Sequence, residues 1–409
     1  MWVHLLDLRL RQIIRNGALS LELPDGTTRT YGSGSPYFAV RLTDPALPRR
    51  LVLNPDLALG EAYMSGALQI EGGDLYGFMA LLLGNLPAHR APALHRPDLV
   101  AQHALRWFQQ FNPVNRSRGN VAHHYDLSGE LYRRFLDKDR QYSCAYFRHP
   151  SDTLEQAQEQ KKAHIAAKLL LRPGQSVLDI GCGWGGLALS LARDHGVSVL
   201  GVTLSEEQHA YATARVKAAG LEDRVSFRLA DYREISGRFD RIVSVGMFEH
   251  VGVPQYRTFF SRVRSLLAED GVALIHTIGR ASPPMSTGPW IRKYIFPGGY
   301  VPALSEVNKA VEREGLWPTD IEVWRLHYAE TLRHWRTRFE AHVDAIEALY
   351  DARFCRMWRF YLVASELSFR IGRQVVFQIQ LARRQDAVPL TREYLYSDTA
   401  PRKNRLAAE

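Results

Sequence analysis

A glycine-rich turn between an apolar run and a helical pattern is the feature that most limits how this chain can fold. Residues 176–196 read SVLDIGCGWGGLALSLARDHG, in which Val177 to Ile180 is typical of a buried strand and the leucines after the glycines suit a helix packed on it. A strand, a glycine turn and a helix in this order are typical of nucleotide-type sites, where the backbone at the start of the helix meets the ligand. Gly181, Gly183 and Gly186 also fit the GxGxxG spacing of a dinucleotide site.

Strand and helix patterns alternate from residue 176 onward. The strand-like runs are SVLDI, VSVLGVT, VSFRLAD, FDRIVSVG and VALIHTIG, and helical patterns follow at 186–195, 206–219 and about 255–268. This rhythm predicts an α/β fold with a doubly wound, mostly parallel sheet that binds its ligand at the carboxyl ends of the strands. Asp179, Thr203, Asp231 and Gly246 fall at such ends.

The residues around the turn favour S-adenosylmethionine over a dinucleotide. Asp179 stands two residues before the first glycine, where its carboxylate would repel a pyrophosphate, and no acid ends the run VSVLGVT to bind a ribose hydroxyl. S-adenosylmethionine carries an ammonium and a sulfonium and no phosphate, and Asp231 with Tyr232 suits its adenine. On spacing alone, a turn without any ligand stays open, and Ser205 with Gln208 fits a helix capping box as well as a ligand contact.

Composition bounds the compartment and the partners. The 409 residues are enough for two or three domains, and no apolar run approaches the ~20 residues of a membrane span. The first residues lack a signal-peptide pattern, and the three cysteines are far apart, so we expect a reducing cytoplasm, no disulfide and no metal site. The net charge of +9 fits an anionic membrane surface or a nucleic acid, as well as an ordinary soluble surface.

The order of patterns predicts four regions. Residues 1–85 form a small α+β domain, with an amphipathic helix that ends at Gly17 and a hairpin around Asp25 and Gly26. Residues 86–120 are a basic, proline-rich linker, residues 121–390 are the catalytic domain and residues 391–409 are a tail. After the fourth strand of the catalytic domain stands GMFEH, without the prolines that accompany methylation of base nitrogens, so a nucleic-acid acceptor is the second choice.

Motifs spread over the chain carry a family resemblance. They are NVAHHYDLSGELYRRFLD, QYSCAYF, LDIGCGWGGLA, GVTLSEEQ, ADYR, MFEHVG, LIHTIG, YIFPGGYVP, HYAETLRHW and QVVFQIQLAR. From about residue 120 to 385 the chain resembles the cyclopropane fatty acid synthases, which are related to the mycolic acid methyltransferases. The resemblance implies a class I methyltransferase with a Rossmann-like, doubly wound sheet, a small N-terminal α+β domain and helical lid insertions.

The activity that the resemblance implies is transfer of a methyl(ene) group from S-adenosylmethionine to the cis double bond of an unsaturated phospholipid acyl chain. It implies a cytoplasmic homodimer, peripheral on the inner face of the membrane, with no nucleic-acid partner. Because an alkene is a weak nucleophile, the enzyme must align the sulfonium methyl with the double bond, keep water from the resulting carbocation and then remove a proton. The alternatives for the product are a methyl-branched or a methylene fatty acyl chain. The alternatives for the methyl acceptor are a small molecule or a nucleic acid.

The resemblance also implies the site residues. A bound bicarbonate ion serves as the base in this family, and its ligands correspond here to Cys144, Glu249, His276, Ile278 and Tyr328. Each has an ordinary structural alternative, such as a small buried cysteine or a hydrogen-bonded strand-end histidine. For S-adenosylmethionine we expect contacts with Tyr142, Ser143, Asp179, Gly181, Gly183, Thr203, Leu204, Gln208, Asp231 and Tyr232. Ser365 stands where many relatives have a cysteine, which excludes a nucleophilic cysteine at that position.

Overall fold

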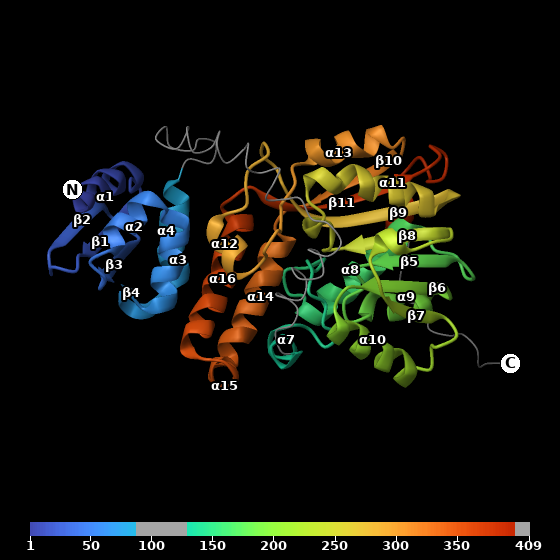
Figure 1. Cartoon of the computed structure of the whole chain (residues 1–409), viewed down its shortest axis with the longest axis horizontal. Coiled ribbons are helices and arrows are strands. Elements are labelled where there is room, and N and C mark those ends of the chain that lie inside the picture. Colours follow the sequence, from blue (N-terminus) through green and yellow to red (C-terminus); the bar gives the residue numbers. More distant parts are fainter. Residues whose placement is uncertain (87–128, 397–409) are drawn as a thin grey trace. The chain divides into compact units, whose positions relative to one another are not determined.

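The computed structural model describes residues 1–86 and 129–396, which group into two compact units (Figure 1). Most of the expected linker at 86–120, and the tail from residue 397 on, lie outside the described residues. The first unit holds residues 1–86, 285–297 and 328–374, and the second holds the remaining described residues. The helices at 285–297 and 328–374 therefore group with the N-terminal residues, although they lie within the range expected for the catalytic domain.

The first unit combines a small sheet with helices from both ends of the chain. Its sheet has the order β2-β1-β3-β4, with strands β1 (Gly17–Glu22), β2 (Thr28–Ser33), β3 (Tyr37–Leu42) and β4 (Leu68–Ile70). The helices of the N-terminal part are α1 (Trp2–Ile13), α2 (Leu47–Leu53), α3 (Pro55–Ser65) and α4 (Leu75–Asn85). Later in the chain come α12 (Pro289–Tyr294), α14 (His327–Ala341), α15 (Val343–Leu349) and α16 (Ala352–Arg370).

The N-terminal hairpin is confirmed, but the end of the first helix is not where we expected it. Strands β1 and β2 pair antiparallel on either side of Asp25 and Gly26. Helix α1 ends at Ile13, and Gly17 opens β1 instead, with a φ of 82°. A Cβ at Gly17 would lie 2.7 Å from the carbonyl oxygen of Pro36, so the glycine serves a close backbone approach.

Long-range packing joins the early and late helices of this unit. Trp290 on α12 is buried against Phe360 on α16, with ring centroids 4.7 Å apart, and its indole lies over Gly60 on α3. Arg356 on α16 donates a hydrogen bond of 2.8 Å to the carbonyl oxygen of Met64. No helix within residues 1–86 and 129–396 has the length and apolar character needed to cross a membrane.

The second unit is built on a seven-stranded sheet with the order β10-β11-β9-β8-β5-β6-β7. Its strands are β5 (Ser176–Ile180), β6 (Ser198–Thr203), β7 (Val225–Leu229), β8 (Phe239–Val245), β9 (Leu267–Arg280), β10 (Trp317–Trp324) and β11 (Gln374–Ala382). The strands from β5 to β9 pair in parallel and β10 pairs antiparallel with β11, which confirms the expected mostly parallel sheet. The helices are α7 (Gly129–Phe135), α8 (Leu154–Leu169), α9 (Gly186–His195), α10 (Glu206–Ala218), α11 (Tyr256–Leu266) and α13 (Leu304–Arg313).

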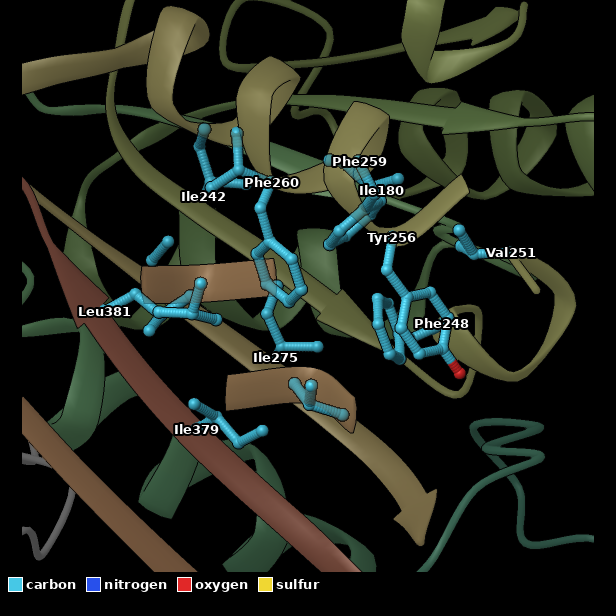
Figure 2. Close-up of a cluster of buried hydrophobic side chains, with 14 of the residues drawn as sticks. Ile180, Ile242, Phe248, Val251, Tyr256, Phe259, Phe260, Ile275, Ile379 and Leu381 are labelled. Atoms are coloured by element: carbon cyan, nitrogen blue, oxygen red, sulfur yellow. The ribbon is translucent and has the colours of Figure 1, made fainter. Parts of the chain in front are cut away.

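Each face of this sheet carries its own apolar core. One core includes Leu178 of β5 and Ile275 of β9 with aromatic side chains of α11, and Figure 2 shows part of it around Phe248 and Phe260. The other includes Val177 and Leu274 together with residues of α8 and α9. Because side chains alternate along a strand, Asp179 and His276 share the second face, which α8 covers.

Candidate active site

The carboxyl ends of β5 to β8 surround a pocket in the second unit. All ten residues expected to contact the cofactor line it, which are Tyr142, Ser143, Asp179, Gly181, Gly183, Thr203, Leu204, Gln208, Asp231 and Tyr232. The lining also includes Gly246 after β8, Trp184 in the glycine turn and Arg140. The ten residues expected from the sequence therefore lie around one pocket, and their contact with the cofactor stays a prediction.

The glycine turn presents its backbone to the pocket. Gly181 and Gly183 have φ angles of 85° and 54°, in the left-handed region that favours glycine. A Cβ at Gly181 would lie 2.8 Å from the Cβ of Met247, whereas one at Gly183 would meet no protein atom within 4 Å. Gly183 thus borders open space on the pocket side, where a ligand can approach the main chain.

Asp179 is a buried carboxyl group that prefers a cationic neighbour. Its side chain is almost fully covered and makes no hydrogen bond or ion pair with the described residues. Burial raises the pKa of Asp179 from 3.8 to about 7, and the ammonium of Lys161 counteracts part of this rise. An ammonium or sulfonium in the pocket would stabilise the ionised form further, as we expected from the sequence.

The polar residues after β6 support each other. Thr203 Oγ1 donates to Gln208 Oε1 at 2.9 Å and accepts from the amide of Ser205 at 3.2 Å. Ser205 Oγ in turn accepts from the amide of Gln208 at 3.3 Å, which caps α10. Ser205 is therefore the N-cap of α10, but the full capping box does not form, because the Gln208 side chain bonds Thr203 instead of the Ser205 amide and also lines the pocket.

Asp231 and Tyr232 follow β7 at the far side of the pocket. Both carboxylate oxygens of Asp231 accept hydrogen bonds from Arg233, at 2.8 and 2.7 Å. The ring of Tyr232 packs edge-on against Phe259, and burial raises its pKa. Because Arg233 donates to both carboxylate oxygens, its positive charge compensates the negative charge of Asp231 in this pocket.

The segment before α8 forms the remaining wall, and buried side chains of α8 hold it. Lys161 is fully buried, and its Nζ donates to Gln141 Oε1 at 2.6 Å and to Ser143 Oγ at 2.8 Å. Gln158, one helical turn earlier, donates to the carbonyl oxygen of Ser143 at 3.0 Å. No motif pointed to Lys161, because its role depends on a loop some twenty residues away.

Two of the residues expected to bind bicarbonate meet at the ends of β8 and β9. Glu249 follows β8 and accepts a 2.6 Å hydrogen bond from the backbone amide of Ile278 at its Oε1. Its other oxygen, Oε2, is buried and has no hydrogen-bond partner within the part of the chain that the structure describes. Burial raises the pKa of Glu249 from 4.5 to about 7.

His276 lies at the same edge of the sheet. Its residue position pairs with Val245 of β8, and its carbonyl oxygen accepts from the amide of Gly246 at 2.9 Å. The side-chain amide nitrogen of Gln378 lies 3.1 Å from His276 Nδ1, and it donates to Nδ1 when the ring carries its proton on Nε2. Burial, with the positive charges of Lys161 and Lys168, lowers the pKa of His276 well below its usual value, so the ring is neutral.

The other two residues expected around the ion are Cys144 and Tyr328. Cys144 is buried next to Ser143, and its thiol contacts the carbonyl oxygen of Ala145 at 3.3 Å. Tyr328 belongs to the first unit, where its ring packs on Phe369 with centroids 4.9 Å apart. The participation of Tyr328 in a site with Glu249 and His276 stays a prediction.

Comparisons with known proteins identify the family. Residues 113–379 match the mycolic acid cyclopropane synthetase family, and residues 9–82 match a domain of unknown function. The chain is 38% identical to the cyclopropane-fatty-acyl-phospholipid synthase of Escherichia coli over 86% of this chain and 89% of that protein. The chain belongs to the mycolic acid cyclopropane synthetase family. It is an S-adenosylmethionine-dependent methyltransferase of the class I fold.

Other relatives point to related lipid chemistry. A probable fatty acid methyltransferase of Pseudomonas putida is 35% identical over 92% of this chain and 96% of that protein. Among solved structures, a cyclopropane synthase of Mycobacterium tuberculosis is 33% identical, with a TM-score of 0.63 over 66% of this chain and 99% of that one. A mycolic acid cyclopropane synthase solved with SAH and CTAB is also 33% identical, with a TM-score of 0.62 over 66% of this chain and 99% of that one.

Proposed function

We propose that this methyltransferase acts on the cis double bond of unsaturated phospholipid acyl chains and closes a cyclopropane ring. The name of the Escherichia coli relative specifies this substrate and product. The structural observation that carries the proposal is the buried Glu249, whose Oε2 lacks a partner among the described residues, at the edge of the sheet where His276 also lies.

The residues at the ends of β8 and β9 fit a small protic anion such as bicarbonate. Glu249 Oε2 is an acceptor that requires a donor, and a neutral His276 offers an N–H at Nε2. The amide of Ile278 already donates to Glu249 Oε1, so it fixes this carboxylate and does not itself remain for the ion. The buried ammonium groups of Lys161 and Lys168, which act on His276, favour negative charge in this region.

Within the proposed reaction, the chain's residues orient, exclude water and receive a proton. The pocket wall around Asp179 and Gly183 would hold the cofactor, which supplies the methyl group. As the double bond takes this methyl, the carbon–sulfur bond would break, S-adenosylhomocysteine would leave and a carbocation would remain on the acyl chain. When bound, bicarbonate supplies a base for a proton of the added methyl group. Glu249 would orient that base by accepting a hydrogen bond from its O–H group. His276, whose Nδ1 faces the amide of Gln378, would donate a hydrogen bond to it from Nε2.

Removing Glu249 tests the proposal. We expect Glu249→Ala to lose most of its turnover while its affinity for S-adenosylmethionine stays nearly unchanged, because Glu249 does not line the cofactor pocket. The exposed Glu222, changed to glutamine, is the matched control. Wild-type turnover should fall in degassed, bicarbonate-free buffer and return when bicarbonate is restored. Turnover indifferent to bicarbonate would remove the ion and leave Glu249 or His276 as the direct base.

A methyl-branched product is the second candidate. Relatives named as fatty acid methyltransferases, including a tuberculostearic acid methyltransferase of Mycobacterium tuberculosis, are 35% identical to the chain. A ring, a methylene group and a methyl branch that keeps a double bond each add one CH2 to the fatty acid, whereas a saturated methyl branch needs a further reduction. We would express the protein in a bacterium without such lipids and fragment its fatty acid methyl esters, since a ring and a branch fragment differently. Unchanged fatty acids would contradict both candidates.

We also infer that the enzyme acts as a cytoplasmic homodimer at the inner face of the membrane and takes its substrate from the bilayer. The net charge of +9 supports attraction to anionic lipids, at about 1 kcal/mol per well-placed basic residue. We expect it to sediment with phosphatidylglycerol vesicles at low salt and to be released at high salt. Failure to bind such vesicles, together with retention of nucleic acid in a pull-down, would favour the nucleic-acid alternative. Sedimentation equilibrium tests the dimer and should give twice the mass of one chain.

A further inference from the structure

Four charged side chains of opposite sign line the cofactor pocket of the second unit, and only two of them pair. They are Asp179, Asp231, Arg140 and Arg233. Arg233 binds Asp231 through two hydrogen bonds of 2.8 and 2.7 Å. Within the described part of the chain, neither Asp179 nor Arg140 forms an ion pair. The pocket therefore presents one carboxyl group and one guanidinium that are left for a ligand.

Both of these groups flank the glycine turn after β5. Asp179 precedes the turn directly. Nη1 of Arg215 on α10 donates to the carbonyl oxygens of Asp139, at 3.4 Å, and of Trp184, at 3.1 Å. Asp139 precedes Arg140 and Trp184 follows Gly183, so the backbone before Arg140 lies close to the glycine turn. The paired Asp231 follows β7 instead, and β6 lies between β5 and β7 in the sheet. The segments that carry the two unpaired charges thus both border the glycine turn of this pocket.

The backbone around Arg140 fixes where its side chain begins. Arg140 has a φ of 55°, and its amide donates to the carbonyl oxygen of Asp137 at 2.9 Å. The carboxylate of Asp137 accepts from the next amide, that of Gln141, at 2.7 Å. The guanidinium carbon of Arg140 lies 4.1 Å from the centroid of the Tyr211 ring on α10, a cation–π contact that holds the group in place.

Among the described residues, no nearby carboxylate forms an ion pair with Arg140. Arg215 and Lys162 bind the carboxylate of Asp139. Oε1 of Glu207 and Nη1 of Arg140 both lie near Gly129, but these two side chains form no ion pair with each other. The N–H groups of Arg140 that the Tyr211 ring does not cover are therefore available to an anion.

We propose that Arg140 binds the carboxylate of the methionine portion of S-adenosylmethionine, while Asp179 faces the ammonium group on the same carbon. The cofactor carries one carboxylate, and an arginine fork is well suited to bind it. This inference rests on the cofactor assignment and adds a residue that no motif of the sequence indicated. It makes the pocket selective for cofactors that retain the amino-acid carboxylate.

Titration calorimetry with four ligands tests this assignment. S-adenosylmethionine and S-adenosylhomocysteine carry the carboxylate, whereas decarboxylated S-adenosylmethionine and 5′-methylthioadenosine lack it. The wild type should bind the decarboxylated cofactor at least tenfold more weakly than S-adenosylmethionine. We expect Arg140→Gln to weaken both carboxylate ligands by about ten- to a hundredfold, the usual range for a hydrogen bond to a charged group. The two ligands without a carboxylate should change less than about twofold, because neither contacts the lost group.

Two further variants complete the experiment. Arg140→Lys keeps the charge and should recover part of the affinity for S-adenosylmethionine. Arg148→Gln removes the same charge from the same segment outside the pocket and should bind all four ligands as the wild type does. Equal weakening of all four ligands by Arg140→Gln, or no weakening of any, overturns the proposal. Equal wild-type affinities for the intact and decarboxylated cofactor overturn it without any variant. A wild type that binds none of the four would instead refute the cofactor assignment itself.

Discussion

Replacing Glu249 by glutamine tests whether burial in the fold opposes the ionisation of this carboxyl group. Glu249 Oε1 accepts one backbone hydrogen bond, and Oε2 is buried without a partner among the described residues. Burial accordingly raises its pKa from 4.5 to about 7. A carboxyl group whose folded-state pKa is raised binds its proton more tightly in the folded protein, so it lowers stability as pH rises from about 4.5 to 7.

The size of the effect follows from the two pKa values. A rise from 4.5 to about 7 corresponds to about 3 kcal/mol of unfolding free energy that is lost once the group is ionised. Glutamine has nearly the same shape and does not titrate. We therefore expect Glu249→Gln to gain about 3 kcal/mol relative to the wild type between pH 5 and pH 8.

Urea unfolding of the ligand-free protein, in buffers without bicarbonate, measures this difference. Both proteins are unfolded at pH 5, 6, 7 and 8, and other titrating groups cancel because both share them. Glu222→Gln, which removes an exposed carboxylate, should follow the wild type at every pH. A stability difference between Glu249→Gln and the wild type that stays constant with pH would refute the reasoning, since it would mean that Glu249 titrates as it does in the unfolded chain.

Three other substitutions probe separate parts of the structure. Gly183→Ala should weaken S-adenosylmethionine binding at least tenfold in calorimetry, because its Cβ would project into the pocket. The control Gly220→Ala has a similar φ of 62° but lies outside the pocket, so it should bind the cofactor normally. Gly60→Ala should lower the thermal stability of the first unit by about 1 to 3 kcal/mol because its Cβ would lie 2.3 Å from an indole ring, and Gly84→Ala, which meets no atom, should not. Lys161→Met should reduce cofactor affinity by about tenfold, since it removes a donor to two side chains of the pocket wall; unchanged affinity would contradict that role.

The alternation of strands and helices predicted the five parallel strands β5 to β9 of the seven-stranded sheet and the edge at which the pocket lies, but not the antiparallel β10 and β11. Parallel strands bring their carboxyl ends to one edge, so Asp179, Thr203 and Asp231 could be placed together without knowledge of any side-chain contact. The end of α1 was predicted wrongly because a glycine after a helical pattern usually caps the helix, whereas Gly17 is required by a close approach to Pro36. The grouping of α12 and α14–α16 with the N-terminal residues depends on contacts between distant segments, which periodicity does not reveal.

Helix α8 shows most clearly why the rest of the site could not be predicted. The part of its sequence that reads EQAQEQKK is almost entirely polar, which is typical of a helix exposed to solvent. In the structure Lys161 and Lys168 are fully buried, and their partners, such as Gln141 and Glu322, come from segments before and far after the helix. A buried lysine is tolerated only when such partners are in place, so the burial is a property of the tertiary fold and not of the local pattern.

This buried polar face of α8 gives the cofactor pocket and the Glu249–His276 region a shared electrostatic origin. Asp179 and His276 lie on the sheet face that α8 covers, and the charge of Lys161 acts on both. For Asp179 the ammonium lowers the pKa and so favours the carboxylate that a cationic cofactor requires. For His276 the same charge opposes protonation and keeps an uncharged ring, whose Nε2–H can donate to an anion. One buried cation thus favours the ionised form of Asp179 in the cofactor pocket and the neutral form of His276 where we propose that an anion binds.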